Sequence, residues 1–328
     1  MKLKEYFAKK KESDGAKGPD TMMERHDFLA KYIRPVQDRL RDDLVMLDNN
    51  MSVWTKNSSH EFSEGCRSCG EGTWLCIFVG PKCNLDCVYC PQGSKYQKDS
   101  AFDHARSFSS WWIDDTKLIV EGAPEDKIRG VSYSGGEPFL YLDKVVEMGN
   151  FVKEKKPKSY QWIYTNGVLA DRDSMTRIYD AGIDEIRFHI NATDFADRVM
   201  ENMRTSRSIF PRVTVEIPVT EKVRTWLIDK GGLEILQRIG VEQLNLAELF
   251  YYTHDPRIEL DPDRFYSFTQ FPFPTLLAEL ESRVYTYQII EAALNKNVDV
   301  LINDCSLERK LVQMLRRSLN PYLGFWRT

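Results

Sequence analysis

The cysteines are the residues of this sequence whose spacing most clearly suggests chemistry. Six of the seven lie between residues 66 and 90, and the seventh is Cys305. In a reducing compartment, such clustering indicates metal ligation rather than disulfides. Cys83, Cys87 and Cys90 have the spacing CxxxCxxC, which can bind three corners of an iron–sulfur cubane and leave the fourth iron without a protein ligand. A chelating amino acid could occupy that iron, so the spacing predicts a reactive cluster.

Other metal sites and a purely structural role also fit some of these cysteines. Cys66-x-x-Cys69 followed by Cys87-x-x-Cys90 has the spacing of a four-cysteine zinc site, as in a non-catalytic zinc-binding interaction module. That interpretation leaves Cys83 without a role. A ferredoxin that only transfers electrons would need a fourth cysteine at ferredoxin spacing, which the sequence lacks. Buried structural cysteines are the remaining alternative.

Short apolar or β-branched runs alternate with amphipathic stretches, and this predicts the elements that position the cysteines. Strand followed by helix, repeated, is typical of right-handed βαβ units and of a mostly parallel sheet or barrel. Upstream, apolar residues at helical spacing over residues 21–47, interrupted by Pro35, predict one or two helices, and a polar stretch follows at 57–72. The predicted strands are 74–79, 128–133, 160–164, 185–190, 213–217, 243–246 and 298–302, and the predicted helices include 140–154, 171–181, 221–239 and 307–319.

Polar motifs directly follow the predicted strands, at the edge where parallel α/β folds place their chemistry. The cysteine motif follows the first strand, SGGEP the second and TNG the third. Arg187 and His189 alternate on the fourth strand and therefore share one face, and Glu216 lies near the end of the fifth. The segment 250–280, which contains an aromatic FPFP loop, is either a lid over this rim or an external connector. Further candidate substrate contacts on the rim are Asn245, Glu248, Tyr251, Tyr252 and His254.

The motif CNLDCVYCP, followed in order by SGGEP, resembles the radical S-adenosylmethionine (SAM) superfamily. The resemblance extends over residues 74–249 and implies an α/β fold, a partial (β/α)6 TIM-like barrel, with N-terminal helical and C-terminal extensions. It implies that Cys83, Cys87 and Cys90 hold a [4Fe-4S] cluster that reductively cleaves SAM. The resulting 5′-deoxyadenosyl radical would abstract hydrogen from a small-molecule, amino-acid or peptide substrate.

The resemblance also implies which residues bind SAM. The methionine amino group of SAM is a cation, which suits the carboxylate of Glu137 and the carbonyls of the two preceding glycines. Arg187 suits the SAM carboxylate because its guanidinium is a planar, permanently charged donor. His189 is open to two interpretations, a ligand contact or proton-transfer group, and a structural histidine. The implied SAM-binding residues are Tyr89 beside the adenine, Gly135, Gly136, Glu137, Thr165, Asn166, Arg187 and His189, and the candidate catalytic residues are His189, Glu216 and Glu248.

Longer stretches resemble a group of radical SAM proteins described as related to pyruvate formate-lyase activating enzyme. These are YTNGVLADRDSMTRIYDAGIDEIRFHI, the later EIP and NLAEL, DCSLERKLVQMLRRSL, and the upstream GCRSCGEG. The kinship makes a glycyl-radical-enzyme activase an alternative function. Cys66, Cys69 and Cys305, with or without Cys76, could bind a second iron–sulfur cluster or zinc. A radical-quenching thiol and structural burial are the competing interpretations of these cysteines.

Composition and charge restrict the remaining possibilities. A net charge of -4 gives no general attraction for nucleic acids or anionic membranes, and no basic patch stands out. The Lys-rich start is not followed by an apolar run and no stretch is long enough to span a bilayer, so a cytoplasmic enzyme is expected. The [4Fe-4S] cluster that the resemblance implies would make it oxygen-sensitive. Its expected partners are a small-molecule or peptide substrate and a reductase with flavodoxin or ferredoxin as electron donor. We expect an N-terminal helical extension over 1–70, the barrel over 71–250, and a C-terminal lid or substrate region over 251–328.

Overall fold

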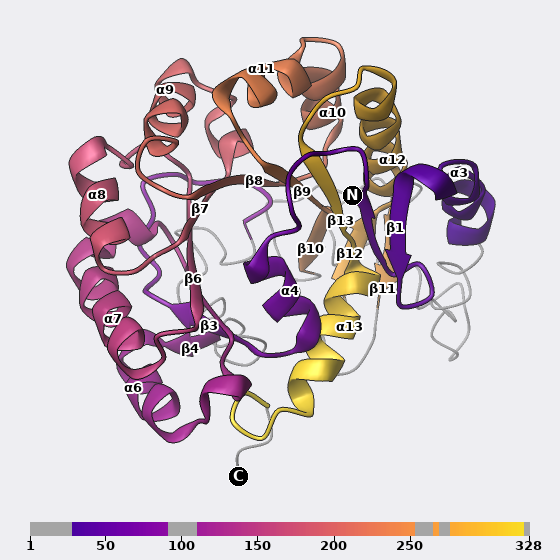
Figure 1. The fold of residues 1–328 in the computed structure, drawn as a ribbon. Helices are drawn as coiled ribbons and strands as arrows, with labels where there is room; N and C mark the ends of the chain where they lie inside the picture. Colours follow the sequence, from indigo (N-terminus) through magenta and orange to yellow (C-terminus); the bar gives the residue numbers. More distant parts are fainter. Residues whose placement is uncertain (1–27, 91–109, 253–264, 269–275, 325–328) are drawn as a thin grey trace, which may run out of the picture.

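The computed structural model describes residues 28–90, 110–252, 265–268 and 276–324. Within them, one curved ten-stranded sheet has the order β1-β2-β13-β9-β8-β7-β6-β5-β3-β4 (Figure 1). The run from β13 to β4 is parallel throughout, so the α/β partial barrel predicted from the sequence is confirmed. Its parallel strands are β3 (Trp74–Phe78), β4 (Ser110–Trp112), β5 (Gly130–Ser134), β6 (Tyr160–Thr165), β7 (Glu185–Phe188), β8 (Arg212–Pro218), β9 (Gln243–Ala247) and β13 (Leu301–Cys305).

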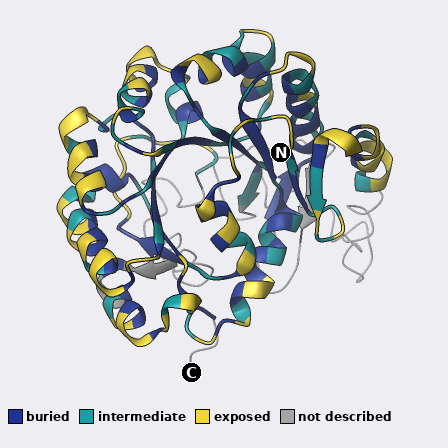
Figure 2. Ribbon diagram, viewed as in Figure 1, coloured by how far each residue is buried: buried dark blue, intermediate teal, exposed yellow. Residues whose placement is uncertain are grey.

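Helices surround the strands, as the predicted βα alternation requires (Figure 1). Their apolar faces and the strand residues Ile163, Ile186 and Val215 belong to one continuous core. Figure 2 shows buried residues along the strands and exposed residues on the outer faces of the helices. The surrounding helices are α6 (Ile113–Gly122), α7 (Leu142–Lys155), α8 (Arg172–Asp180), α9 (Asp197–Ser206), α10 (Glu221–Ile228), α11 (Gly232–Ile239) and α12 (Leu280–Asn295).

The stretch 221–239, predicted as one helix, forms two helices, α10 and α11. Gly231 precedes α11 with φ +73°, a left-handed conformation that glycine adopts without a Cβ penalty. The predicted strand 298–302 is also displaced. The chain forms β13 only from Leu301, and the strand continues to Cys305, which brings this cysteine to the C-terminal end of the strand.

The N-terminal segment departs from the predicted helices over 21–47. Residues 1–27 lie outside the described part of the chain, and helical turns occupy Leu29–Ile33 and α3 (Arg34–Arg39). Pro35 does not interrupt a helix; it lies in the first turn of α3, where the missing N–H costs no hydrogen bond. The apolar residues that follow α3 belong to a hairpin of β1 (Leu44–Leu47) and β2 (Ser52–Thr55), whose turn is built from left-handed Asp48, Asn49 and Asn50.

The sheet crosses both expected domain boundaries, at 70/71 and 250/251. β2 pairs with β13 antiparallel, and β13 pairs with β9 in parallel. Strands from both expected extensions therefore complete the barrel sheet, so these boundaries do not separate structural units.

Helix α4 (Glu64–Glu71) lies inside the ring of strands (Figure 1). Ser63 caps its N-terminus and also donates a hydrogen bond to Glu185, the first residue of β7, at 2.6 Å. A Cβ on Gly65 would lie 2.5 Å from the Arg187 guanidinium and 3.0 Å from the Trp162 ring. Only glycine allows this close approach, so α4 plugs the barrel at the end where β7 begins. The sequence pattern indicates only a polar stretch here.

The C-terminal part of the chain closes the structure around this plug. Helix α13 (Leu307–Ser318) follows β13 and packs against α4. A second, three-stranded sheet has the order β10-β12-β11, formed by Phe250–Tyr252, Leu276–Glu279 and Phe265–Phe268. The FPFP loop and His254, named above as candidate lid and contact, lie outside the described residues.

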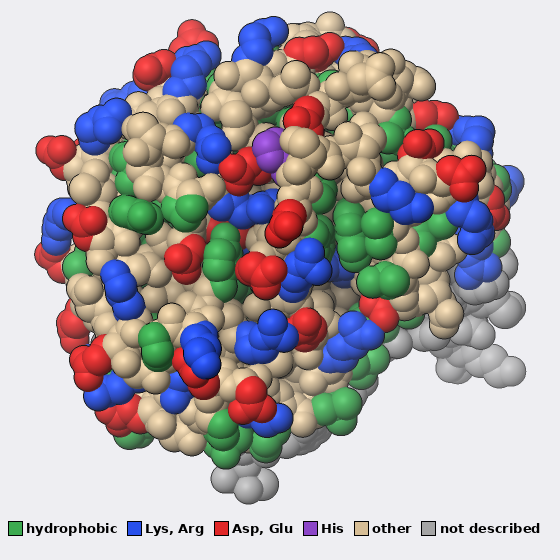
Figure 3. Space-filling model, in the orientation of Figure 1, with side chains coloured by type: hydrophobic (Ala, Val, Ile, Leu, Met, Phe, Trp, Pro, Cys, Tyr) green, Lys and Arg blue, Asp and Glu red, His purple; other side chains and the backbone are tan. Residues whose placement is uncertain are grey.

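The surface carries charges of both signs. On the face seen in Figure 3, Lys and Arg side chains are interspersed with Asp and Glu. In the described part of the chain, no helix has the length and apolar character needed to cross a bilayer.

Candidate functional site

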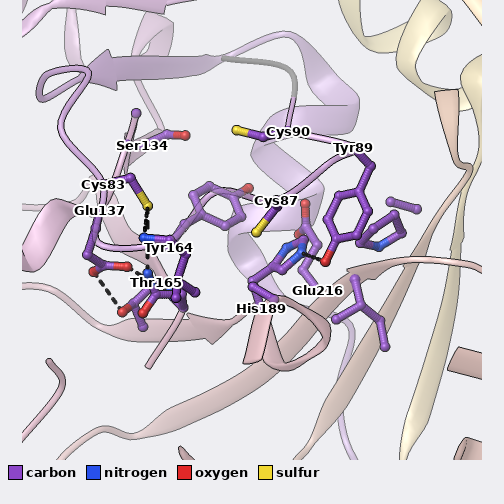
Figure 4. A pocket seen from close by; sticks show the side chains of 18 of the residues that line it. Cys83, Cys87, Tyr89, Cys90, Ser134, Glu137, Tyr164, Thr165, His189 and Glu216 are labelled. Atoms are coloured by element: carbon purple, nitrogen blue, oxygen red, sulfur yellow. Dashed lines mark hydrogen bonds between the residues drawn. The ribbon is translucent and has the colours of Figure 1, made fainter. Parts of the chain in front are cut away.

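A cavity of about 310 Å³ opens at the C-terminal ends of the parallel strands. Figure 4 shows the cysteine loop on one side of this cavity, with strand-end side chains opposite it. Of the residues predicted to lie on the rim, most line this one cavity, as expected for a parallel α/β barrel. The predicted residues that line it are Cys83, Cys87, Tyr89, Cys90, Gly135, Gly136, Glu137, Thr165, Asn166, His189, Glu216 and Glu248.

The cysteine loop follows β3 and presents three thiols to the cavity. The Cys90 backbone N–H donates to the Cys87 carbonyl at 3.1 Å, and Asn166 Nδ2 lies 3.9 Å from Cys83 Sγ. Burial raises the pKa of the Cys87 thiol to about 11, and the nearby Cys90 and Cys83 thiols add to this shift. Three neighbouring thiols become thiolates together only when a cationic group offsets their charge, so the donor set fits an iron–sulfur cluster.

The arrangement does not fit the alternative four-cysteine zinc site. Cys66 Sγ lies in the lumen beside Gln243 Nε2, at 3.2 Å, and not beside the cavity-lining Cys87 and Cys90. Among the residues that the structure describes, no three Cys, His, Asp or Glu side chains are placed as ligands of a single ion. In a cubane, by contrast, each cysteine binds a different iron, so the ligand sulfurs need not share one point.

The SGGEP turn ties the cysteine loop to the sheet. The backbone N–H of Gly136 donates to Gly80 O and that of Glu137 to Lys82 O, both at 2.8 Å. A Cβ on Gly136 would lie 2.0 Å from Lys82 O, which explains why this position must be glycine. Backbone hydrogen bonds therefore hold the cysteine loop and the SGGEP turn together.

The Glu137 carboxylate connects the two loops that follow β5 and β6. It accepts hydrogen bonds from Thr165 Oγ1 at 2.8 Å, from the Asn166 backbone N–H at 2.8 Å and from the Phe139 backbone N–H at 3.1 Å. Burial raises the pKa of Glu137, and these donors oppose that rise. Its predicted contact with the SAM amino group stays a prediction, but its carboxylate lies at the cavity wall, where such a contact requires it.

Tyr89 and His189 form a pair on the cavity wall. His189 Nε2 lies 3.4 Å from the Tyr89 hydroxyl oxygen, and the two ring centroids are 5.7 Å apart. Burial lowers the pKa of His189 to about 4, so the imidazole is neutral near pH 7. Burial also raises the pKa of Tyr89, with a further contribution from Cys87. Two uncharged side chains can therefore share one hydrogen bond here.

Arg187 does not line the cavity, unlike the other predicted SAM-binding residues. Its guanidinium lies in the barrel lumen, 2.8 Å from Glu185 Oε1, 3.1 Å from Glu216 Oε2 and 3.3 Å from the Tyr164 hydroxyl. These partners occupy its donors, and its predicted role at the SAM carboxylate stays a prediction. The side chain instead connects the region beside the α4 plug to Glu216 at the cavity wall.

The two other candidate catalytic carboxylates both line the cavity and are already held. Glu216 Oε2 accepts a hydrogen bond from Asn245 Nδ2 at 2.9 Å in addition to the Arg187 pair. Glu248 Oε2 accepts the backbone N–H of Leu307 at 2.9 Å and lies 3.9 Å from Arg283 Nε. Both are therefore fixed carboxylates with neutralising cations nearby.

Several residues of the cavity carry no signal in the sequence. Lys310, on α13, lines it and lies with its Nζ 5.0 Å from the centre of the Phe250 ring. Tyr164 completes the wall above Arg187. No motif marks these positions, since Lys310 reads as one of several charges on an amphipathic helix.

Comparison with known proteins agrees with this geometry. Residues 77–219 match the family model described as the Radical SAM superfamily. A protein of Methanocaldococcus jannaschii named "Putative glycyl-radical enzyme activating enzyme" is 28% identical over 127 residues, which cover 38% of this chain and 32% of the relative. A "Probable GTP 3′,8-cyclase" of Methanococcus maripaludis is 29% identical over 118 residues, 36% of each chain. These alignments thus span about a third of the curated relatives.

A solved structure supports the fold independently. The crystal structure of Streptococcus suis SuiB bound to S-adenosylmethionine superimposes with a TM-score of 0.50 at 13% identity, covering 71% of this chain and 50% of that one. At this identity the likeness concerns the fold alone. The family match and the CxxxCxxC loop at the cavity show that residues 77–219 form a radical SAM domain, so the protein is an enzyme whose cofactors are a [4Fe-4S] cluster and SAM.

Proposed function

We propose that the cavity binds the cluster and SAM side by side, and that a substrate bound at its β8 and β9 side loses a hydrogen atom to the SAM-derived radical. One observation carries this proposal: the three loop cysteines and the ends of β5 to β9 line one cavity. When bound, the cluster supplies the electron that splits SAM. The substrate class is a small molecule, an amino acid or a peptide.

The chain's own residues would hold SAM against the cysteine loop. Glu137 places a carboxylate where the methionine amino group would lie, and its bonds to Thr165 and Asn166 keep it in place. The amide group of Asn166 also reaches the loop, 2.7 Å from Asn84 Oδ1. Neutral His189 with Tyr89 would provide an uncharged wall for the adenosyl group.

The opposite end of the cavity would hold the substrate. Ile217, Leu249 and Phe250 make it largely apolar, which helps to exclude water and competing hydrogen donors from a radical. Glu216 is fixed by Arg187 and Asn245, so it can orient a polar group of the substrate without moving. Lys310 is available at this end for an anionic group of the substrate.

A glycyl-radical-enzyme activase is the second candidate, because the M. jannaschii relative is named for that activity. In that case the substrate is a glycine of a partner enzyme instead of a free metabolite. In either case an external donor, a flavodoxin or ferredoxin with its reductase, would reduce the cluster.

The test is isotope transfer into 5′-deoxyadenosine. Reduced enzyme and SAM are incubated with a deuterated metabolite extract, with deuterated peptides, and with a glycyl-radical enzyme deuterated at glycine. Deuterium transferred to 5′-deoxyadenosine from the metabolite extract or the peptides supports hydrogen abstraction from a free substrate. Deuterium transferred from the glycyl-radical enzyme supports the activase. Formation of 5′-deoxyadenosine without deuterium from any source, although each substrate pool is fully labelled, would contradict hydrogen abstraction from these classes.

A further inference from the structure

A second group of thiols lies in the barrel lumen, away from the cysteine loop. Cys66 and Cys69 come from α4 and Cys305 from the end of β13. Cys66 Sγ lies 3.2 Å from Gln243 Nε2 and 3.6 Å from Asn245 Nδ2. The Cys69 thiol interacts electrostatically with those of Cys305 and Cys66. Segments more than 200 residues apart in the chain thus bring three thiols together.

Buried cations surround these thiols. Arg309 is 3% exposed, and its guanidinium acts electrostatically on both Cys69 and Cys305. It lies over the Phe62 and Trp54 rings, 5.3 and 5.9 Å from their centres, and 3.5 Å from Cys66 O.

Arg309 differs from other buried arginines of the barrel in its counterions. Arg187 pairs with Glu185, and Arg283 pairs with Asp304. Arg309 instead acts electrostatically on Asp48, which already pairs with Arg316 at 2.6 Å, and on the Cys69 and Cys305 thiols. A buried cation needs compensating anions, and thiolates at Cys69 and Cys305 would supply them.

Free thiols do not supply those anions. A free thiol is mostly protonated near pH 7, because its ordinary pKa is about 8.5. Metal binding would convert Cys69 and Cys305 to thiolates, which would then offset the charge of Arg309.

We propose that Cys66, Cys69 and Cys305 bind a second iron–sulfur cluster in the lumen, in addition to the cluster of the proposed function. A polynuclear cluster fits better than a single zinc ion, because no three donors in the described part of the chain share one metal position. The site adjoins the catalytic cavity, since Cys305 interacts with Glu216 and Lys310, which both line that cavity.

Iron analysis of the full-length chain tests this site without relying on activity. The variant Cys83→Ala/Cys87→Ala/Cys90→Ala lacks the loop ligands and is reconstituted anaerobically with iron and sulfide. We expect it to keep about four irons per chain, as one remaining cubane requires. Adding Cys69→Ala and Cys305→Ala should remove this iron and the electron paramagnetic resonance signal of the reduced cluster. The matched control adds Cys76→Ala, a buried β3 cysteine, and should keep the iron.

Two results would overturn the second cluster. The loop triple variant could bind no iron, or only zinc, while its circular dichroism and melting temperature match the wild type. Alternatively, its iron could survive the loss of Cys69 and Cys305. Because a folding defect could imitate ligand loss, Cys305→Ser is also made in the wild-type chain. It should lose about half of the iron and still form 5′-deoxyadenosine from SAM, which separates this site from the loop cluster.

Discussion

At the scale of single residues, the cavity depends on charges buried in the lumen below it. Glu185 is fully buried and accepts hydrogen bonds from Arg187, Ser63 and Thr214. Arg187 in turn holds Glu216 at the cavity wall. A carboxylate at the start of β7 thereby positions a candidate catalytic carboxylate at the end of β8.

Glu185→Gln should lower the free energy of unfolding by about 3 kcal/mol at pH 7, because it leaves a buried guanidinium with one counterion fewer. Burial alone would raise the pKa of Glu185, but Arg187, Arg212 and the hydrogen bond from Ser63 together outweigh burial and hold it below 4.5. This stabilisation is thus complete above pH 4.5 and is lost as the pH falls further. Urea unfolding at several pH values should show the difference between wild type and variant narrowing below pH 4.5. Glu154→Gln, at an exposed pair with Lys155, is the control, and an equal effect there would refute the assignment.

Most site residues could be predicted because they lie in contiguous motifs. The cysteine loop, SGGEP and TNG each hold their side chains at a strand end, so the sequence places them on one rim. Arg187 could not be placed in this way. Arg187 lies on β7, which ends at Phe188 before His189, and its guanidinium turns to Glu185 on the same strand and to Ser63, which the packed α4 brings within reach.

At the scale of elements, α4 is the least predictable part of the fold. Its sequence EGCRSCGE has no apolar helical periodicity, because the helix packs through glycine, serine and cysteine inside the barrel. The parallel strands are easier to predict from the sequence, since buried parallel strands are short apolar runs. The hairpin β1-β2 was mistaken for helix because its apolar residues, read with those of α3, also fit a helical period.

Gly65→Ala tests the packing of α4 in the lumen. The added methyl would overlap the Arg187 guanidinium and touch Trp162, which should cost about 1–3 kcal/mol as overpacking. Gly122→Ala is the matched control, since this helical glycine of α6 has no neighbour within 4 Å of the added Cβ. Thermal unfolding should show a lower melting temperature for Gly65→Ala alone. Equal melting temperatures of the two variants would mean that α4 does not fill the barrel.

At the scale of the whole molecule, the chain's two ends build the site together. α4 comes before the first barrel strand and β13 is the last barrel strand, yet both border the lumen with α13. The sequence could not show this, because pairing of β13 with β9 and β2 joins segments that lie far apart in the chain. The expected division into extensions and barrel therefore describes order along the chain, not independent units.

The reaction at the loop cysteines is tested most directly by 5′-deoxyadenosine formation. Wild-type enzyme, reconstituted anaerobically and reduced with dithionite, should convert SAM to 5′-deoxyadenosine and methionine. Cys83→Ala, Cys87→Ala and Cys90→Ala should each reduce this product below detection by mass spectrometry, because each removes an iron ligand, whereas Cys76→Ala should not. Product formation at the wild-type rate by any of the three loop variants would contradict the account.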